Sequence, residues 1–227
     1  MTETFKKIFL TKISNKGSQM PYLNLKDESV RVKKTAEEVL ISGGTFMPMI
    51  GIFKEGEYKG AIVLREPTEE DEVLREYEKS QIFAEGCLLI SALHGDEVVV
   101  SFSTDVGFID SDASEMPAIN VMHATDDFAE AIFMPFEVDE EGRFKAWLLE
   151  GDAPGEIKPE FLSHNMIATL AHNMVNHYHQ SRPETMMRTL AKSGHVITLA
   201  DDRQFLPTDF SGTIEPSAEL NKMLREG

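Results

Sequence analysis

The sequence predicts an α+β protein whose largely antiparallel sheet is built from hairpins and packs on a central helix at about residues 159–180. Apolar runs come in pairs joined by short turn sequences, such as residues 54–57. Several shorter helical patterns are interspersed without the regular strand and helix alternation that would indicate a parallel sheet. The stretch 158–180 carries the best-specified helical pattern in the chain.

The central helix is predicted from its first residues and from its wide apolar face. Pro159 suits a first helical position, and Glu160 complements the positive end of the helix dipole. Apolar side chains recur at spacings of three and four, at Leu162, Met166, Ile167, Leu170, Met174, Val175 and Tyr178. At 100° per residue they fill an arc of roughly 160–220°, wider than the stripe of a surface helix, so we expect cover on more than one side.

Strands are predicted along most of the remaining chain. Residues 5–13 indicate a first strand with a basic face, residues 22–25 a second, and residues 118–122 a later one. Hairpins are predicted for residues 47–53 with 58–64, 128–138 with 143–149, and 195–200 with 204–206. Pro135 predicts that its strand lies at a sheet edge or contains a bulge, because proline cannot donate to a ladder.

Two helices are predicted in the first half of the chain. Thr35 and Glu38 form a capping box that opens a short helix ending at Gly43. Thr68 precedes a run of four acids and predicts the N-cap of a helix that reaches about residue 84. The apolar residues of this second helix are few, namely Val73, Leu74, Tyr77 and Ile82, so one narrow stripe should touch the core while the rest displays charge.

Residues 87–93 and 98–102 are apolar runs on either side of a short polar turn, and we interpret them as a buried hairpin that follows Gly86. A helix over residues 82–93 is an open alternative, because periodicity alone does not separate a short buried strand from a buried helix.

The last third of the chain predicts two further helices and a linker. Ser181 and Glu184 form a second capping box for a helix that ends at Gly194, and a short helix begins near Ser217. Gly151, Pro154 and Gly155 mark residues 150–158 as a linker. We expect a single domain over residues 1–227, with a subdivision into 1–150 and 157–227 as the alternative.

Charge is very unevenly distributed along this chain of net charge -17. Residues 1–34 hold eight Lys or Arg against three Asp or Glu, whereas residues 66–156 hold twenty-four acids against four bases. The acidic part disfavours direct contact with nucleic acid or with anionic membrane, since both carry the same sign of charge. A basic protein is the favoured partner.

The single cysteine, Cys87, excludes a disulfide within the chain and fits a reducing compartment. The N-terminal residues lack an apolar run long enough for a signal peptide, and no run approaches the roughly 18 residues that span a bilayer. We therefore expect a soluble cytoplasmic protein.

Histidines cluster in the central helix, which raises the question of a metal or acid-base site. His164, His172 and His179 are eight and seven residues apart, whereas helical ligands of one ion normally lie four apart. No nucleotide, flavin or dithiol motif is present, so we expect no cofactor and no metal. A hydrolase-like enzyme, either metal-free or metal-dependent, is the alternative, with its site at His164, His172, His195, Asp201 and Asp202.

The favoured function is that of an acidic, non-enzymatic binding protein. Its carboxylates would imitate nucleic-acid phosphates and so inhibit or modulate a basic RNA- or DNA-processing protein, as small acidic inhibitors of viruses and mobile elements do. The expected partner-binding residues are Glu69, Glu70, Asp71, Glu72, Glu76, Asp139, Glu140 and Glu141. The alternatives are that the charge only maintains solubility, or that the chain is a structural or assembly protein.

A homodimer is also expected. The basic N-terminal segment and the acidic middle attract one another, and residues 128–138 and the first strand could both present sheet edges. Contact between the two charged segments within one chain is the alternative.

Overall fold

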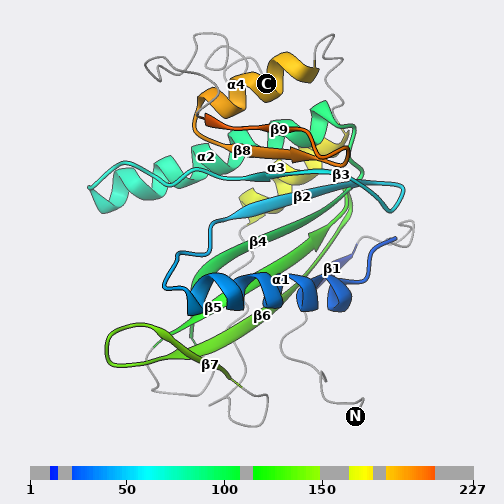
Figure 1. Cartoon of the computed structure of the whole chain (residues 1–227). Helices are drawn as coiled ribbons and strands as arrows, with labels where there is room; N and C mark the ends of the chain where they lie inside the picture. The colour runs from blue at the N-terminus through cyan, green and yellow to red at the C-terminus, as the bar shows by residue number, and fades with distance from the viewer. Residues whose placement is uncertain (1–10, 15–21, 108–114, 149–163, 176–182, 208–227) are drawn as a thin grey trace. The chain divides into compact units, whose positions relative to one another are not determined.

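The computed structural model describes residues 11–14, 22–107, 115–148, 164–175 and 183–207 (Figure 1). Within these ranges the chain forms four helices and nine strands, and the α+β fold with antiparallel strand pairing is confirmed. Several predictions lie outside the described residues, namely the strand at 5–10, the linker at 150–158, the Ser181 cap, both ends of the predicted central helix, and the helix from Ser217. The alternative boundary near residue 150 falls there too.

The chain divides into two compact units. Unit 1 comprises Met1–Pro48 and Val99–Ala171, and unit 2 comprises Met49–Val98 and His172–Gly227. Each unit combines distant parts of the sequence, so each is described by itself.

Unit 1 is built on β6 (Phe128–Val138), which pairs antiparallel with three other strands: β1 (Thr11–Ser14), β5 (Met116–Ala124) and β7 (Phe144–Trp147). The strand order is β1-β6-β5-β4, where β4 (Glu97–Val106) belongs to this unit from Val99 onward. Helix α1 (Leu25–Ile41) packs against β5, β6 and β7. The predicted hairpin of residues 128–138 and 143–149 is confirmed.

Of the two alternatives predicted from Pro135, the sheet edge is wrong, whereas a register shift of the bulge type is present in the same strand, between Glu137 and Val138 of β6. Pro135 lies opposite Ala118 of β5, and elsewhere along its length β6 also pairs with β1 and β7. The carbonyl of Pro135 accepts from the N–H of Leu148 at 2.9 Å. In an antiparallel ladder the backbone nitrogen and the C=O of one residue point the same way. The proline nitrogen, which lacks a hydrogen, therefore faces Leu148 and not β5. Strand β6 pairs on both sides within its own chain, so it does not offer the free sheet edge on which the predicted homodimer partly rested.

Helix α1 begins eleven residues earlier than predicted. Asn24 is the N-cap, and its side chain accepts from the N–H of Lys26 at 3.0 Å, so the predicted strand at 22–25 is wrong. The Thr35 hydroxyl donates to the Arg31 carbonyl in mid-helix instead of capping a new helix. The predicted end is confirmed, because the chain leaves the helix through Gly43 at φ +76°.

Unit 2 contains a second antiparallel arrangement in the order β2-β3-β8-β9. Its strands are β2 (Met49–Lys54), β3 (Glu57–Val63), β8 (Val196–Leu199) and β9 (Gln204–Phe205). Both predicted hairpins of this unit are confirmed. Glu55 at φ 53° and Gly56 at φ 79° form the two-residue turn with positive φ that matches the twist of the flanking strands.

Helix α2 (Glu72–Ala92) is the longest helix of the described part. The predicted buried hairpin of residues 87–93 and 98–102 is wrong, because its first half belongs to this helix. Residues 87–92 continue the helix and are all buried, so the helical alternative is the right one. Gly86, which we interpreted as a break, lies inside the helix, where a Cβ would collide with the side chain of Leu64. The glycine therefore permits close packing of the helix on residues that follow β3.

Helices α3 (His164–Val175) and α4 (Pro183–Lys192) confirm the predicted helices within the described residues. Leu170 and Met174 are buried, whereas Val175 is 62% exposed and does not belong to the buried face. The Ser91 hydroxyl of α2 donates to the carbonyl of Asn173 at 2.8 Å. Across the described ranges, no helix combines the length and the apolar composition needed to cross a membrane.

Candidate functional site

The first turns of α2 bring five of the predicted partner-binding carboxylates together. Asp71, not Thr68, is the N-cap, and its Oδ1 accepts from the N–H groups of Val73 and Leu74 at 3.1 and 3.0 Å. All five carboxylate residues are exposed: Glu69 and Glu70 just before the helix, Asp71 at its cap, and Glu72 and Glu76 in its first two turns. An Asp at this position stabilises the helix through its hydrogen bonds and its charge, and leaves its neighbours free to face solvent.

Three large apolar side chains share this end of α2. Val73, Leu74 and Tyr77 are 77%, 53% and 65% exposed, so the prediction that they touch the core is wrong. Their spacings of one, three and four place them on one side of the helix, beside the line of Glu72 and Glu76. Ile82 is buried as predicted. We call the combined set the acidic α2 surface: Glu66, Glu69, Glu70, Asp71, Glu72, Val73, Leu74, Glu76 and Tyr77.

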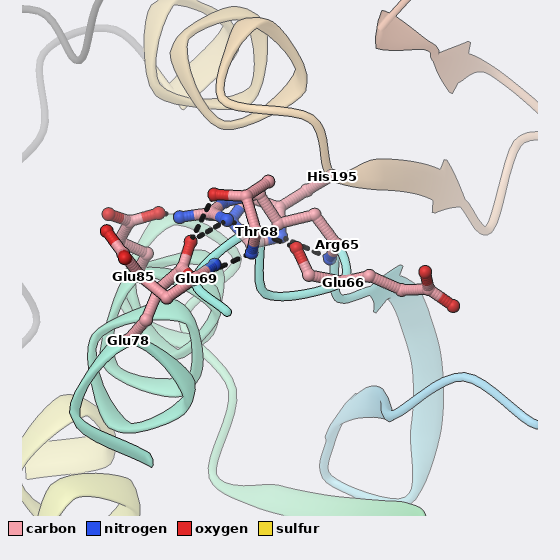
Figure 2. Close-up of polar contacts among 7 residues, drawn as sticks. All are labelled: Arg65, Glu66, Thr68, Glu69, Glu78, Glu85 and His195. Atoms are coloured by element: carbon pink, nitrogen blue, oxygen red, sulfur yellow. Dashed lines mark hydrogen bonds and ion pairs between the residues drawn. The ribbon is translucent and has the colours of Figure 1, made fainter. Parts of the chain in front are cut away.

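A nearly buried carboxylate, Glu78, anchors the segment that leads into this surface (Figure 2). Its Oε1 accepts from Arg65 Nη1 at 2.6 Å and from the Thr68 hydroxyl at 3.2 Å. Its Oε2 accepts from the N–H groups of Thr68 and Glu69 at 2.7 and 2.9 Å. Figure 2 shows the Glu66 side chain pointing away from these contacts.

The electrostatics of Glu78 show how firmly it is held. Burial by itself would raise the pKa of this carboxyl, but the hydrogen bond and charge of Arg65 and the two backbone N–H groups lower it to about 2. Glu78 is therefore ionised throughout the physiological range, and its charge is balanced inside the protein.

His195 ties the same segment to the start of β8. Its Nδ1 accepts from the N–H of Arg65 at 3.3 Å, and its Nε2 lies 3.3 Å from Glu85 Oε2. Because Nδ1 is an acceptor, the ring proton resides on Nε2 and is directed at Glu85. The imidazole is fully buried, so it bridges three chain segments instead of facing a substrate.

The buried contacts of Glu78 and His195 and the acidic α2 surface thus have different roles. Arg65, Thr68, Glu78, Glu85 and His195 form an internal polar cluster that fixes residues 65–69 against α2. The acidic α2 surface outside it carries six acids against one base, Arg75, within residues 66–77. Only Glu76 among these acids is drawn into an ion pair with a lysine, Lys79 at 2.5 Å, so within the described residues most of this charge faces solvent.

The other predicted acidic residues lie in unit 1, in the turn between β6 and β7. Asp139 accepts from the N–H groups of Glu141 and Arg143 at 3.0 and 2.9 Å. The backbone N–H and the guanidinium of Arg143 lower the pKa of the Asp139 carboxyl. Arg143 also contacts Glu141 Oε2 at 2.7 Å. Asp139 therefore shapes the turn, and Arg143 offsets part of its charge, while Glu140 and Glu141 are exposed.

The residues of the alternative enzyme site lie on α3 and at the two ends of β8. His195 lies just before β8 and Asp201 just after it, so a four-residue strand separates their backbones by roughly 15 Å or more. Asp201 binds Arg203 at 2.8 Å, and Asp202 occupies the turn at φ 64°. His172 is exposed on α3, and the side chain of His164 lies outside the described residues. Among the residues described, no three His, Cys, Asp or Glu side chains are grouped as a metal would require.

Comparisons of this chain with models of protein families, with curated proteins and with solved structures find no match. Its function must therefore be inferred from the residues of the site.

Sequence reasoning missed Glu78, which looked like one more acid of an acidic helix. A signal was present in the spacing, because Glu78, Ile82, Gly86 and Leu89 recur at intervals of four and three and are all buried. An acid on a buried helical face requires cationic or N–H partners, and Arg65 lies shortly before it in the chain.

Proposed function

We propose that this protein is an acidic binding protein that inhibits or modulates a basic, nucleic-acid-binding protein through the acidic α2 surface. The location we propose is the reducing cytoplasm, a choice supported by the single, buried Cys87. The turn residues Asp139, Glu140 and Glu141 are proposed as a weaker, secondary contact, since Arg143 offsets part of their charge.

The observation that supports this proposal most is the exposure of Val73, Leu74 and Tyr77 among carboxylates. Charge that served only solubility would not need large apolar side chains, because exposed apolar groups work against solubility. Apolar side chains rimmed by charged ones are typical of protein interaction sites. The charge is acidic, so the complementary partner surface is basic.

Nucleic-acid mimicry accounts for both components of the surface. Grooves that bind single strands combine positive charge for the phosphates with apolar or aromatic platforms for the bases. The carboxylates would occupy the positions of phosphates, and Tyr77 with its apolar neighbours would occupy those of bases. The internal polar cluster around Glu78 supports this role by holding residues 65–69 in one position, which reduces the entropy lost on binding.

The proposal predicts that a partner will bind through α2 in a charge-dependent way. The partner is captured on immobilised protein from cells that make this chain, purified, and tested for association by biolayer interferometry. Replacing Glu69, Glu70, Asp71 and Glu72 by their amides should slow association about tenfold or more at low salt, because long-range attraction is lost. The fold should persist, since Asn also caps helices well. Single-stranded RNA or DNA should compete with the protein for its partner.

A matched control carries the same charge change elsewhere. Amides at the exposed Asp27, Glu55, Asp126 and Asp202 should slow association much less than the quadruple change in α2. Serine at Val73, Leu74 and Tyr77 should instead speed dissociation, because it removes apolar contact and leaves the charge intact. Equal effects of the two amide variants, together with no effect of the serine variant, would show that the charge serves solubility alone.

A further inference from the structure

The outward face of α1 is a second surface of unusual composition, and it lies in unit 1. Six residues line a shallow hollow of about 310 Å³ there: Val30, Lys33, Lys34, Glu37, Glu38 and Ile41. Val30 and Ile41 are 56% and 67% exposed, although both are large and apolar. The opposite side of the helix, with Leu25, Ser29, Val32 and Ala36, is the one that is buried. Helix α1 thus carries large apolar side chains on two sides, and the described residues of unit 1 bury only one of these sides.

The residues of this outward face are arranged symmetrically about the middle of the helix. Val30 and Ile41, Lys33 and Glu38, and Lys34 and Glu37 each lie at equal distances from the point between residues 35 and 36. A two-fold axis that runs between two copies of α1 at the level of that point, perpendicular to both helices, makes the helices antiparallel. Each residue of one copy then lies level with the other member of its pair in the second copy. Val30 then meets Ile41 of the second copy at both ends of the contact. Lys34 lies level with Glu37 of the second copy and one residue, about 1.5 Å along the axis, from its Glu38.

Charge also favours a second copy at this face. The strip contains two lysines and two glutamates and is neutral, in a chain whose net charge is -17. Copies of the chain can therefore approach here without net repulsion between the two strips. Within one helix each Lys precedes its Glu by four residues, which is the weaker order for an intrahelical pair. The exposed Glu38 is therefore well placed to pair with a different chain.

Trp147 of β7 fixes part of this face. Its indole N–H donates to Glu37 Oε2 at 2.9 Å, and the Lys33 ammonium lies 5.2 Å from its ring centre. These two contacts hold one lysine and one glutamate in position on the same flank of the strip. Lys34 and Glu38 on the other flank are exposed.

We propose that two copies of this chain associate through an antiparallel, two-fold symmetric contact between their α1 helices, in which Val30 packs on Ile41 and Lys34 pairs with Glu38 of the second copy. The contact involves one helix from each chain, so it belongs among small, reversible interfaces. The dimer should therefore dissociate measurably on dilution.

Charge reversal at Lys34 and Glu38 tests the pairing. Sedimentation equilibrium of the full chain should show a dimer. Lys34→Glu or Glu38→Lys should each raise its dissociation constant by about tenfold, because both symmetric copies of the pair become repulsive. The double variant K34E/E38K should restore dimerisation, since each pair is then attractive again. Lys26→Glu is the matched control on the same helix: it changes the same charge at an exposed residue outside the strip and should have little effect.

Cross-linking tests the geometry. Residues 30 and 41 are about 16 Å apart along one helix, too far for a disulfide, and position 30 would lie equally far from position 30 of the second copy. Oxidised V30C/I41C should therefore form a covalent dimer, whereas V30C or I41C alone should not. The native Cys87 is buried and should not interfere. A monomer at all concentrations would overturn the proposal, as would a dimer that ignores K34E or fails to cross-link in V30C/I41C.

Discussion

Glu78→Ala is expected to lower the free energy of unfolding by about 2–4 kcal/mol, among the largest effects of any single substitution in unit 2. The change removes the acceptor of two side-chain donors and of the N–H groups of Thr68 and Glu69. It also leaves the guanidinium of Arg65, which is 24% exposed, without its closest counter-charge. Urea denaturation followed by circular dichroism measures the loss.

Glu76→Ala is the matched control for this experiment, because Glu76 lies two residues earlier in α2 and its pair with Lys79 is exposed. Its removal should cost less than about 1 kcal/mol. Similar losses for Glu76→Ala and Glu78→Ala would contradict an anchoring role for Glu78. Glu78→Gln should fall between them, since an amide retains the shape and one acceptor.

The same carboxyl should contribute to the acid sensitivity of the fold. The pKa of Glu78 is about 2 in the folded protein, below its ordinary value of 4.5, so its stabilisation is fully present above pH 4.5 and is lost as the pH falls towards 2. The unfolding free energy of the Glu78→Gln variant should therefore decline less steeply than that of the wild type between these values. Parallel declines would indicate that other carboxyls account for acid unfolding.

Gly86→Ala is expected to destabilise the protein by about 1–3 kcal/mol, although alanine is the better helix former by about 1 kcal/mol. A Cβ at this position collides with the Leu64 side chain and lies 3.4 Å from that of Ile50, so Leu64 would have to move. Leu64 and Ile50 are 3% and 0% exposed. Thermal unfolding monitored at 222 nm should show the decrease.

A second substitution tests the cause of this effect. Leu64→Val shortens the colliding side chain, so the loss in the double variant should be smaller than the sum of the two single losses. Ser80→Ala, at an exposed position of the same helix, should be close to neutral. An increase in stability for Gly86→Ala would mean that helix propensity outweighs packing there.

The sequence predicted those elements whose signals are local. The hairpin turn at Glu55 and Gly56 was predictable because a two-residue turn needs positive φ at both positions. The start of α1 was not predictable, because Asn24 and Thr35 are both good N-cap residues. Burial of Leu25 and Val32, which the sequence does not show, favours the start at Asn24. Gly86 misled for a related reason, because a glycine selected for close approach looks the same in a sequence as one selected for a break.

The candidate site was predictable in part. Clustering of acids between residues 66 and 76 correctly indicated an exposed, charged helix start. Exposure of Val73, Leu74 and Tyr77 was not predictable, because apolar residues at helical spacing normally face the core and only the tertiary structure shows that the first turns of α2 do not. The contacts of His195 in the same cluster were missed because His195 and Arg65 are 130 residues apart.

The position of Trp147 has a practical consequence for studying cooperativity. It is the only tryptophan in the chain, and its ring packs on Phe136 and Phe144 within unit 1 at centroid distances of 5.7 and 5.3 Å. Its fluorescence thus reports the loss of tertiary structure in unit 1, whereas circular dichroism averages over both units. Coincident denaturation curves from the two probes would mean that the units melt as one cooperative body, and separated curves would reveal an intermediate in which one unit persists alone.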